Sequence, residues 1–172
     1  QLDGKHFTAH VKDGDTVIQQ ISSTNKSKLL FFTDKANCYY LNAYDIETTQ
    51  PSNLGNYLPT MLQLQHEKIL YVISTEDFKG YVLFAFENGK VAKINLSSYE
   101  TKTNRTKVIN AYNTDSKLVS INAIEKDCDF MAISSIDKVL VVNTELINPK
   151  DTKSSQGVNV LKSKKDSYMI EF

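Results

Sequence analysis

Two stretches of the chain gather lysine and arginine, the side chains that most often bind phosphate. The first basic segment, residues 101–117, sets four basic residues against Asp115: Lys102, Arg105, Lys107 and Lys117. The second basic segment, residues 150–165, sets five lysines against Asp151: Lys150, Lys153, Lys162, Lys164 and Lys165. Because cations that neutralise phosphates supply most nucleic-acid affinity, both segments are candidate phosphate contacts. A merely solvated surface is the alternative interpretation.

Residues that often serve catalysis are present without the spacing that catalysis needs. His6 and His10 could suggest a metal pair, but His66 is the only further histidine. Cys38 and Cys128 form no CxxC motif, so neither a zinc cluster nor a disulfide framework is expected. No Gly-rich phosphate loop, HExxH motif or nucleophile elbow occurs. We therefore expect no catalytic residue, metal site or cofactor in this segment.

The composition is that of a folded protein, and we expect one domain over residues 1–172. Hydrophobic residues make up 41% of the chain and charged residues 23%. No apolar run approaches the roughly 18 residues of a membrane span, and the N-terminus has no leader pattern. A soluble, cytoplasmic protein is expected. The 20 basic residues balance 20 acidic ones, so any nucleic-acid binding must depend on local patches.

Short apolar, β-branched and aromatic runs predict the strands that would position these segments. Six runs are the clearest: residues 29–33, 38–41, 69–74, 81–86, 131–134 and 139–142. Leu29-Leu30-Phe31-Phe32 does not alternate apolar with polar residues, so both faces of its sheet must be covered. No stretch keeps a clean helical period. The pattern predicts an all-β protein of stacked antiparallel sheets, with residues 6–11 and 16–22 as strands of a preceding unit.

A strand, a tight turn and a second strand recur three times along the chain. Aligning the copies places Ala36, Gly89 and Asp137 at one turn position. Asn88-Gly89 favours a type I′ hairpin, because both central residues of that turn need positive φ. A third strand also recurs, since residues 107–110 align with residues 156–159. About three and a half units of roughly 50 residues and four strands predict a propeller-like or pinwheel array, with the basic segments side by side on one rim.

The repeat text also carries a family resemblance. Its motifs are Leu29-Leu30-Phe31-Phe32-Thr33-Asp34-Lys35 with Tyr39-Tyr40-Leu41-Asn42-Ala43-Tyr44-Asp45-Ile46, Glu87-Asn88-Gly89-Lys90-Val91-Ala92-Lys93, Tyr99-Glu100-Thr101-Lys102-Thr103-Asn104-Arg105 and Gln156-Gly157-Val158. From about residue 13 to the end, the chain resembles the C-terminal β-pinwheel domain of bacterial type II DNA topoisomerase A subunits, those of gyrase and topoisomerase IV.

The resemblance implies a non-catalytic domain that binds and bends double-stranded DNA along a basic rim during strand passage. The implied partners are the rest of the A subunit, together with the ATPase B subunit, in the cytoplasm on the bacterial chromosome. ATP and magnesium would bind in other parts of the enzyme. The expected DNA contacts are eight residues: Lys102, Arg105, Lys107, Lys150, Lys153, Lys162, Lys164 and Lys165.

Two departures from the family pattern limit what can be carried over. Gyrase A subunits have a box rich in glutamine, arginine and glycine, whereas residues 51–57 contain one glycine and no basic residue. The choice between gyrase and topoisomerase IV therefore stays open. Cleavage in the family uses a tyrosine next to an arginine, and Arg105, the only arginine, has no such neighbour. A propeller-like protein-interaction module without DNA binding is the alternative function.

The aromatic residues could suggest base stacking, but most lie within apolar runs. We predict that Tyr39, Tyr40, Phe84 and Phe86 belong to the core between blades rather than to a platform for nucleic-acid bases. Tyr57 and Tyr112, placed on the third strands of their units, stay open.

Overall fold

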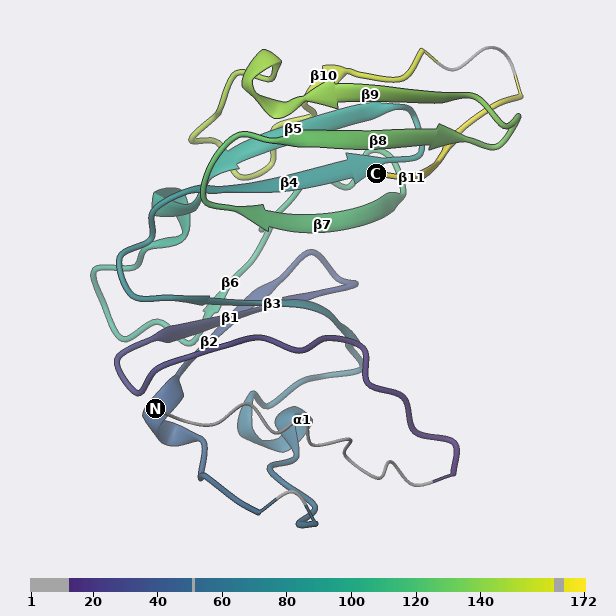
Figure 1. The fold of residues 1–172 in the computed structure, drawn as a ribbon. Coiled ribbons are helices and arrows are strands. Elements are labelled where there is room, and N and C mark those ends of the chain that lie inside the picture. The colour runs from purple at the N-terminus through teal and green to yellow at the C-terminus, as the bar shows by residue number, and fades with distance from the viewer. Residues whose placement is uncertain (1–12, 51, 163–165) are drawn as a thin grey trace, which may run out of the picture.

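The protein is a stack of three antiparallel β-sheets, which we call blades 1, 2 and 3 (Figure 1). The computed structural model describes residues 13–50, 52–162 and 166–172. Helical structure in this part of the chain is limited to four short elements: η1 (Ala43–Asp45), α1 (Leu58–Met61), η2 (Leu96–Tyr99) and η3 (Thr144–Leu146). The all-β fold class predicted from the apolar runs is confirmed.

Blade 1 has the strand order β3-β1-β2-β6. Its strands are β1 (Lys28–Thr33), β2 (Cys38–Asn42), β3 (Ile69–Thr75) and β6 (Lys107–Val108). Blade 2 has the equivalent order β7-β4-β5-β10. Its strands are β4 (Tyr81–Phe86), β5 (Lys90–Asn95), β7 (Leu118–Ile124) and β10 (Val158–Asn159). In each blade a central hairpin is flanked by a long strand on one side and a two-residue strand on the other.

Blade 3 keeps the hairpin and one flanking strand, in the order β11-β8-β9. Its strands are β8 (Asp129–Ser134), β9 (Val139–Asn143) and β11 (Met169–Glu171). Within the described residues, no strand pairs with the free edge of β9.

The two-residue strands are exchanged between repeats, which the sequence pattern did not predict. β6 follows the hairpin of blade 2 but pairs with β2 of blade 1, and β10 pairs with β5 of blade 2. Val108 lies opposite Cys38, and Val158 lies opposite Val91. The aligned hairpins make Cys38 equivalent to Val91, so Val108 matches Val158. The sequence alignment, which matched Val108 with Gly157, was therefore wrong by one residue.

The hairpin turns lie where they were predicted, with a different geometry. Gly89 N–H donates to the Phe86 carbonyl at 3.0 Å, and Ala36 and Asp137 make equivalent bonds. These three residues have φ of 82°, 54° and 58°. Asn88 does not have positive φ. The type I′ prediction is wrong, because each turn needs one left-handed residue at its end rather than two at its centre.

Aromatic side chains fill the interface between blades 1 and 2. Phe32 meets Phe84 edge to face, with ring centroids 5.7 Å apart, and Phe84 stacks on Tyr112 at 5.3 Å. Tyr40 and Phe86 belong to the same buried cluster, as predicted. Burying each such side chain contributes roughly 1.5–3 kcal/mol, so this interface dominates the core.

A second interface joins blade 2 to blade 3. Leu83, Ala85 and Val91 pack against Ala132 and Met169. The hairpin of blade 2 is therefore buried on both faces, as its unbroken apolar runs predicted.

Four other predictions were wrong or fall outside the described residues. Tyr39 is buried on the opposite face of blade 1, with Leu29 and Phe31, rather than between blades. Residues 16–22 form no strand, and Tyr57 lies at the N-cap of α1 rather than on a strand. Residues 6–11 lie outside the described part of the chain.

Candidate nucleic-acid interface

The first basic segment and residues 150–162 of the second run along the same edge of successive blades. In blade 1, Tyr40 N–H donates to the Thr106 carbonyl at 3.0 Å, just before β6. In blade 2, Lys150 N–H donates to the Lys93 carbonyl at 2.8 Å, and Asn95 N–H donates to the Lys150 carbonyl at 2.9 Å. Each segment is thus held by backbone bonds to the second hairpin strand of the blade one repeat earlier, β2 for the first segment and β5 for the second. The blade geometry fixes where their side chains emerge.

Two buried tyrosines fix the first basic segment on either side of β6. The Tyr99 hydroxyl donates to the Ala111 carbonyl at 2.6 Å, and the Tyr112 hydroxyl donates to the Thr33 carbonyl at 2.6 Å. Ala111 N–H in turn donates to the Ala36 carbonyl at 2.7 Å. Between these anchors, residues 101–106 lie on the surface and expose Lys102 and Arg105.

Lys107 differs from Lys102 and Arg105, because its ammonium group already has an anionic partner within the protein. Its Nζ lies 3.5 Å from Glu67 Oε1 and 5.0 Å from the centre of the Tyr39 ring. The neighbouring Tyr39 hydroxyl, together with the Glu67 charge, raises the pKa of Lys107. This lysine stays charged, but its charge is partly neutralised by the Glu67 carboxylate.

Glu67 is the residue that sequence reasoning missed. Its side chain is 4% exposed, yet it accepts hydrogen bonds from Thr33 Oγ1 at 2.6 Å, Tyr39 OH at 2.7 Å and Asn37 Nδ2 at 3.0 Å. Burial alone would raise the pKa of this carboxyl, but these bonds and Lys107 outweigh burial and lower it to about 2. Glu67 therefore ties the exchanged strand β6 to the hairpin of blade 1.

The second basic segment also divides into exposed and anchored lysines. Lys150 and Lys162 are exposed. Lys153 Nζ donates to the Ser98 carbonyl at 3.0 Å and lies 5.8 Å from the centre of the Tyr99 ring. Lys164 and Lys165 lie outside the described residues, so their contact with DNA stays a prediction.

Polar contacts join the two basic segments to each other. Asn113 Nδ2 donates to the Ser154 carbonyl at 3.0 Å, and Gln156 Nε2 donates to Asp115 Oδ2 at 2.9 Å. Lys90 Nζ donates to Gln156 Oε1 at 3.2 Å. The fold thus brings together segments that are about 40 residues apart in the sequence.

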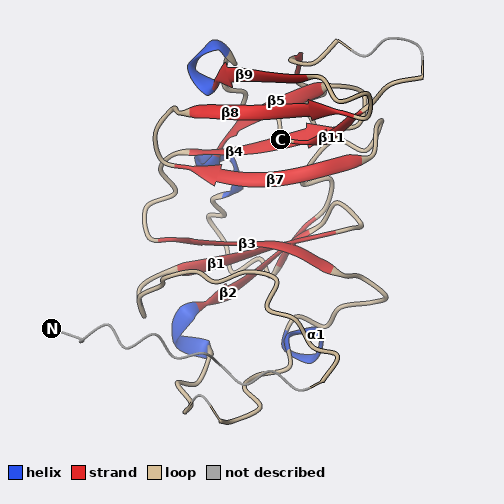
Figure 2. Ribbon diagram, turned by 45° about the vertical axis from the view of Figure 1, so that its right-hand side comes forward, coloured by secondary structure: helices blue, strands red, loops and turns tan. Residues whose placement is uncertain are grey.

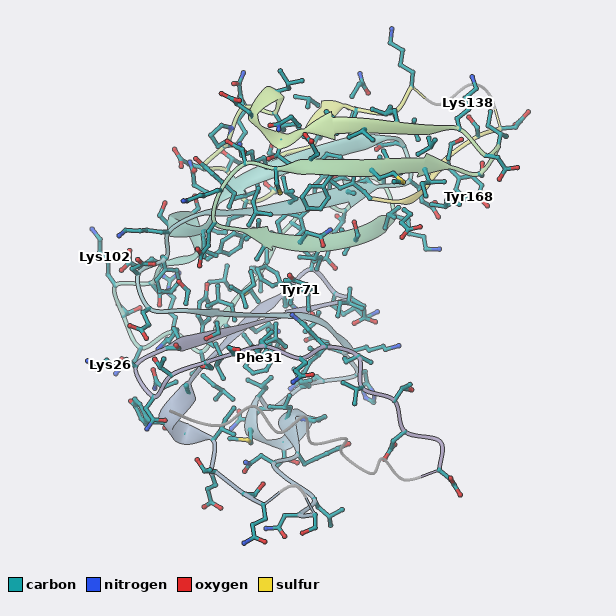
Figure 3. The ribbon with its side chains drawn as sticks, in the orientation of Figure 1. Lys26, Phe31, Tyr71, Lys102, Lys138 and Tyr168 are labelled. Carbon is teal, nitrogen blue, oxygen red and sulfur yellow. The ribbon has the colours of Figure 1, made fainter. Side chains whose placement is uncertain are left out.

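Four of the eight expected DNA contacts are exposed cations without an ion pair in the described part of the chain. These are Lys102, Arg105, Lys150 and Lys162. Figure 3 shows Lys102 projecting from the loop between blades 1 and 2. Such a set can bind phosphates along a path, and phosphate contacts carry no direct information on base sequence.

Lys93 is a further cation that does not reach the surface. Its side chain is 2% exposed, and its Nζ lies 2.6 Å from Asp127 Oδ1 and 3.1 Å from the Thr144 carbonyl. It also lies 4.3 Å from the centre of the Tyr81 ring. Hydrogen bonds from Lys93 and then Thr144 lower the pKa of Asp127. This ion pair connects blade 2 to blade 3.

Neither a metal centre nor a membrane-spanning helix is found in the described residues. Among the described residues, no group of three or more His, Cys, Asp or Glu side chains is placed to hold a metal ion. No helix in residues 13–50, 52–162 or 166–172 is both long and apolar enough to cross a membrane.

The chain is similar to known proteins both in sequence and in fold. No family model matches the chain. The DNA gyrase A subunit of Helicobacter pylori is 34% identical over 112 residues, which cover 62% of this chain and 13% of that protein. The DNA gyrase A subunit of Campylobacter jejuni is 27% identical over 93% of this chain and 20% of that protein. The chain thus spans a fifth or less of the length of these two relatives.

Solved structures match nearly the whole chain. The C-terminal domain of DNA topoisomerase IV matches with a TM-score of 0.78 and 21% identity, over 95% of this chain and 51% of that one. The Escherichia coli ParC C-terminal domain matches with a TM-score of 0.72 and 13% identity, over 96% of this chain and 70% of that one. By sequence the chain is a homologue of DNA gyrase A subunits, and by fold it is a β-pinwheel like the C-terminal domains of topoisomerase IV and ParC.

Proposed function

We propose that this chain is a non-catalytic domain that binds and bends double-stranded DNA for a type II DNA topoisomerase. The observation that supports the proposal most is the placement of four unpaired cations, Lys102, Arg105, Lys150 and Lys162, on segments that occupy the same edge of successive blades. The relatives named as DNA gyrase A subunits make DNA the favoured source of phosphate.

The proposed binding mode follows from the division between exposed and anchored lysines. Lys102 and Arg105 on one blade, and Lys150 and Lys162 on the next, contact phosphates of one duplex. Lys107 and Lys153 act mainly by holding their segments in place, because their ammonium groups already bind Glu67 and the Ser98 carbonyl. Phosphate contacts on a stack of rigid blades bend a duplex without reading its sequence. Binding is therefore sequence-tolerant.

In the whole enzyme, this domain works with the rest of its own A subunit, together with an ATPase B subunit, in the cytoplasm on the bacterial chromosome. ATP and magnesium serve the reaction at sites outside this segment. The parent enzyme is a gyrase or a topoisomerase IV. Sequence similarity favours gyrase, since the curated relatives carry that name, whereas the absence of a Gln/Arg/Gly-rich stretch in residues 51–57 favours topoisomerase IV.

A salt titration of duplex binding tests this proposal. Each phosphate neutralised contributes about 0.9 to the slope of log affinity against log salt. Replacing Lys102, Arg105, Lys150 and Lys162 together with Gln should flatten the slope by roughly 3 to 4 units. The matched control replaces the exposed residues Lys35, Lys68, Lys126 and Lys138 with Gln. In Figure 3, Lys138 lies far from Lys102.

The control variant should keep most of the slope, although both variants lose the same charge. Equal flattening in the two variants would mean diffuse attraction and would refute the assigned surface. Binding that does not weaken with salt, or no binding at all, would favour the alternative function, a protein-interaction module.

A further inference from the structure

The outer edge of β3 has the properties of a strand that pairs with other chains. β3 lies at the edge of blade 1, and no strand of the described residues pairs with its outer side. Its sequence is Ile69-Leu70-Tyr71-Val72-Ile73-Ser74-Thr75, which contains no charge and no proline. Every residue of it except Leu70 and Ser74 is β-branched or aromatic. An uncharged edge strand of this length and β-propensity is a hazard for aggregation.

The side chain of Gln19 takes the place of a neighbouring strand at the centre of this edge. Its Nε2 donates to the Val72 carbonyl at 2.8 Å, and its Oε1 accepts from Val72 N–H at 2.8 Å. A paired strand would offer Val72 the same donor and acceptor. Because both backbone groups of Val72 are bonded to Gln19, they point away from β1. Backbone direction alternates along a strand, so the N–H and C=O of Ser74 point to the same outer side.

Gln19 belongs to a segment, residues 19–23, that side chains hold against β3. The Ser74 hydroxyl donates to Ser23 Oγ at 2.9 Å. Figure 2 shows this part of the chain as a loop, with no strand before β1. Gln19 is half-buried, whereas the other residues of the stretch 13–26 are exposed. The segment is therefore attached mainly through the Gln19 amide rather than through burial of its apolar side chains.

The outer edge of blade 2 is also bonded by a side chain from outside its sheet. β7 is the edge strand there and has seven residues, as β3 does. Ala123 N–H of β7 donates to the Tyr71 hydroxyl at 3.1 Å. Figure 3 shows Tyr71 where blade 1 faces blade 2. At β3 and at β7, a side chain thus bonds a backbone group that a further strand would otherwise take.

We propose that Gln19 closes the outer edge of β3 and thereby prevents two copies of this chain from pairing through that strand. A second copy is the relevant partner because it presents the same uncharged edge. Two identical edges complement each other when the strands run antiparallel about a two-fold axis. Val72 and Ser74 would then find backbone partners in the other copy. Pairing needs an open edge, so its apparent affinity scales with the fraction of molecules that Gln19 has left open.

Replacement of Gln19 tests the proposal by sedimentation equilibrium at several protein concentrations. Gln19→Ala removes both bonds to Val72 and should tighten self-association by roughly tenfold or more. The matched control is Gln20→Ala, because Gln20 is the same residue type at the next position and is exposed. It should leave self-association unchanged. Gln19→Glu should do so too, because its carboxylate still accepts from Val72 N–H and its charge opposes strand pairing.

A proline on the edge separates pairing through β3 from association at another surface. Ser74→Pro removes an N–H from the outer side of β3 and leaves the bonds with β1 intact, so the sheet should tolerate it. The double variant Gln19→Ala/Ser74→Pro should return to the self-association of the original chain. Self-association of Gln19→Ala no tighter than that of the original chain would overturn the proposal. Tight association of the double variant would overturn it as well.

Amide exchange of Val72 provides a second measurement, made at concentrations where every variant is monomeric. The Val72 amide should be protected in the original chain despite its place at an edge. Gln19→Ala should speed its exchange by roughly tenfold or more, whereas Gln20→Ala should not change it. Equal exchange in Gln19→Ala and the original chain would mean that Gln19 does not close the edge, which also contradicts the proposal.

Discussion

The two basic segments occupy the same edge of neighbouring blades but use their residues differently. In blade 1 the exchanged strand carries Lys107, which is held by the buried carboxylate of Glu67. The equivalent residue in blade 2 is Gly157, whose φ is +79°. A Cβ atom added at this position would collide with backbone atoms of Val91. Equivalent positions in a repeat therefore need not share a function. The exchanged strand is anchored by an ion pair in one blade and by close backbone packing in the next.

The largest expected effect breaks the backbone packing in blade 2. Gly157→Ala should destabilise the protein by about 3 kcal/mol or more, because it combines strain at positive φ with a backbone collision. Gly55→Ala is the control, since that site also has positive φ but open space around it. Urea unfolding of both variants measures the difference. Losses of similar size would mean that β10 is not packed tightly against Val91.

The next effect concerns the anchor of blade 1. The pKa of Glu67 is about 2 in the folded protein, against about 4.3 in an unfolded chain. A lowered folded-state pKa stabilises the protein above pH ~4.3, and this stabilisation is lost as the pH falls toward 2. Glu67→Gln should remove roughly 2 kcal/mol at pH 7 and much less at pH 2.

Unfolding of Glu67→Gln and wild type at the two pH values checks this prediction. The exposed residue Glu47 supplies the control Glu47→Gln, which should change little at either pH. An equal loss of stability at pH 7 and pH 2 for Glu67→Gln would rule out its ionised carboxylate as the source.

The smallest expected effect is a gain of stability at the turn of blade 3. Asp137 has φ of 58° and is exposed, a conformation that costs non-glycine residues about 1 kcal/mol or more. Asp137→Gly should raise stability by roughly 0.5–1 kcal/mol, offset in part by the greater freedom of the unfolded chain. Thermal unfolding measures the change. A lower melting temperature would show that the Asp137 side chain contributes more than its backbone strain costs.

The hairpins and their turns could be predicted from sequence because they depend on local signals. Runs such as residues 81–86 and the glycine at position 89 specify strand and turn without distant partners. Strand exchange could not be predicted in this way. Only two residues of β6 and of β10 pair with their neighbours, so their partners are decided by tertiary packing.

The candidate site was harder to predict than the fold. Residues 101–117 and 150–162 lie at equivalent edges of successive blades, because the repeat sets that placement, and their contact with DNA stays a prediction. The ion-pair partners of individual cations could not be predicted from the sequence. Glu67 stands between His66 and Lys68 and reads as a surface residue, and Lys93 reads as the polar face of a strand. Their burial depends on Lys107 and Asp127, which are distant in sequence.

The most direct test of the account compares exposed and anchored cations at equal charge change. The variant Lys102→Gln/Arg105→Gln should flatten the salt dependence of duplex binding by about 2 units and leave the melting temperature unchanged. The variant Lys107→Gln/Lys153→Gln should lower the melting temperature and flatten the salt dependence much less. If the second pair flattened it as much as the first without loss of stability, the anchored lysines would be the DNA contacts, which would contradict the account.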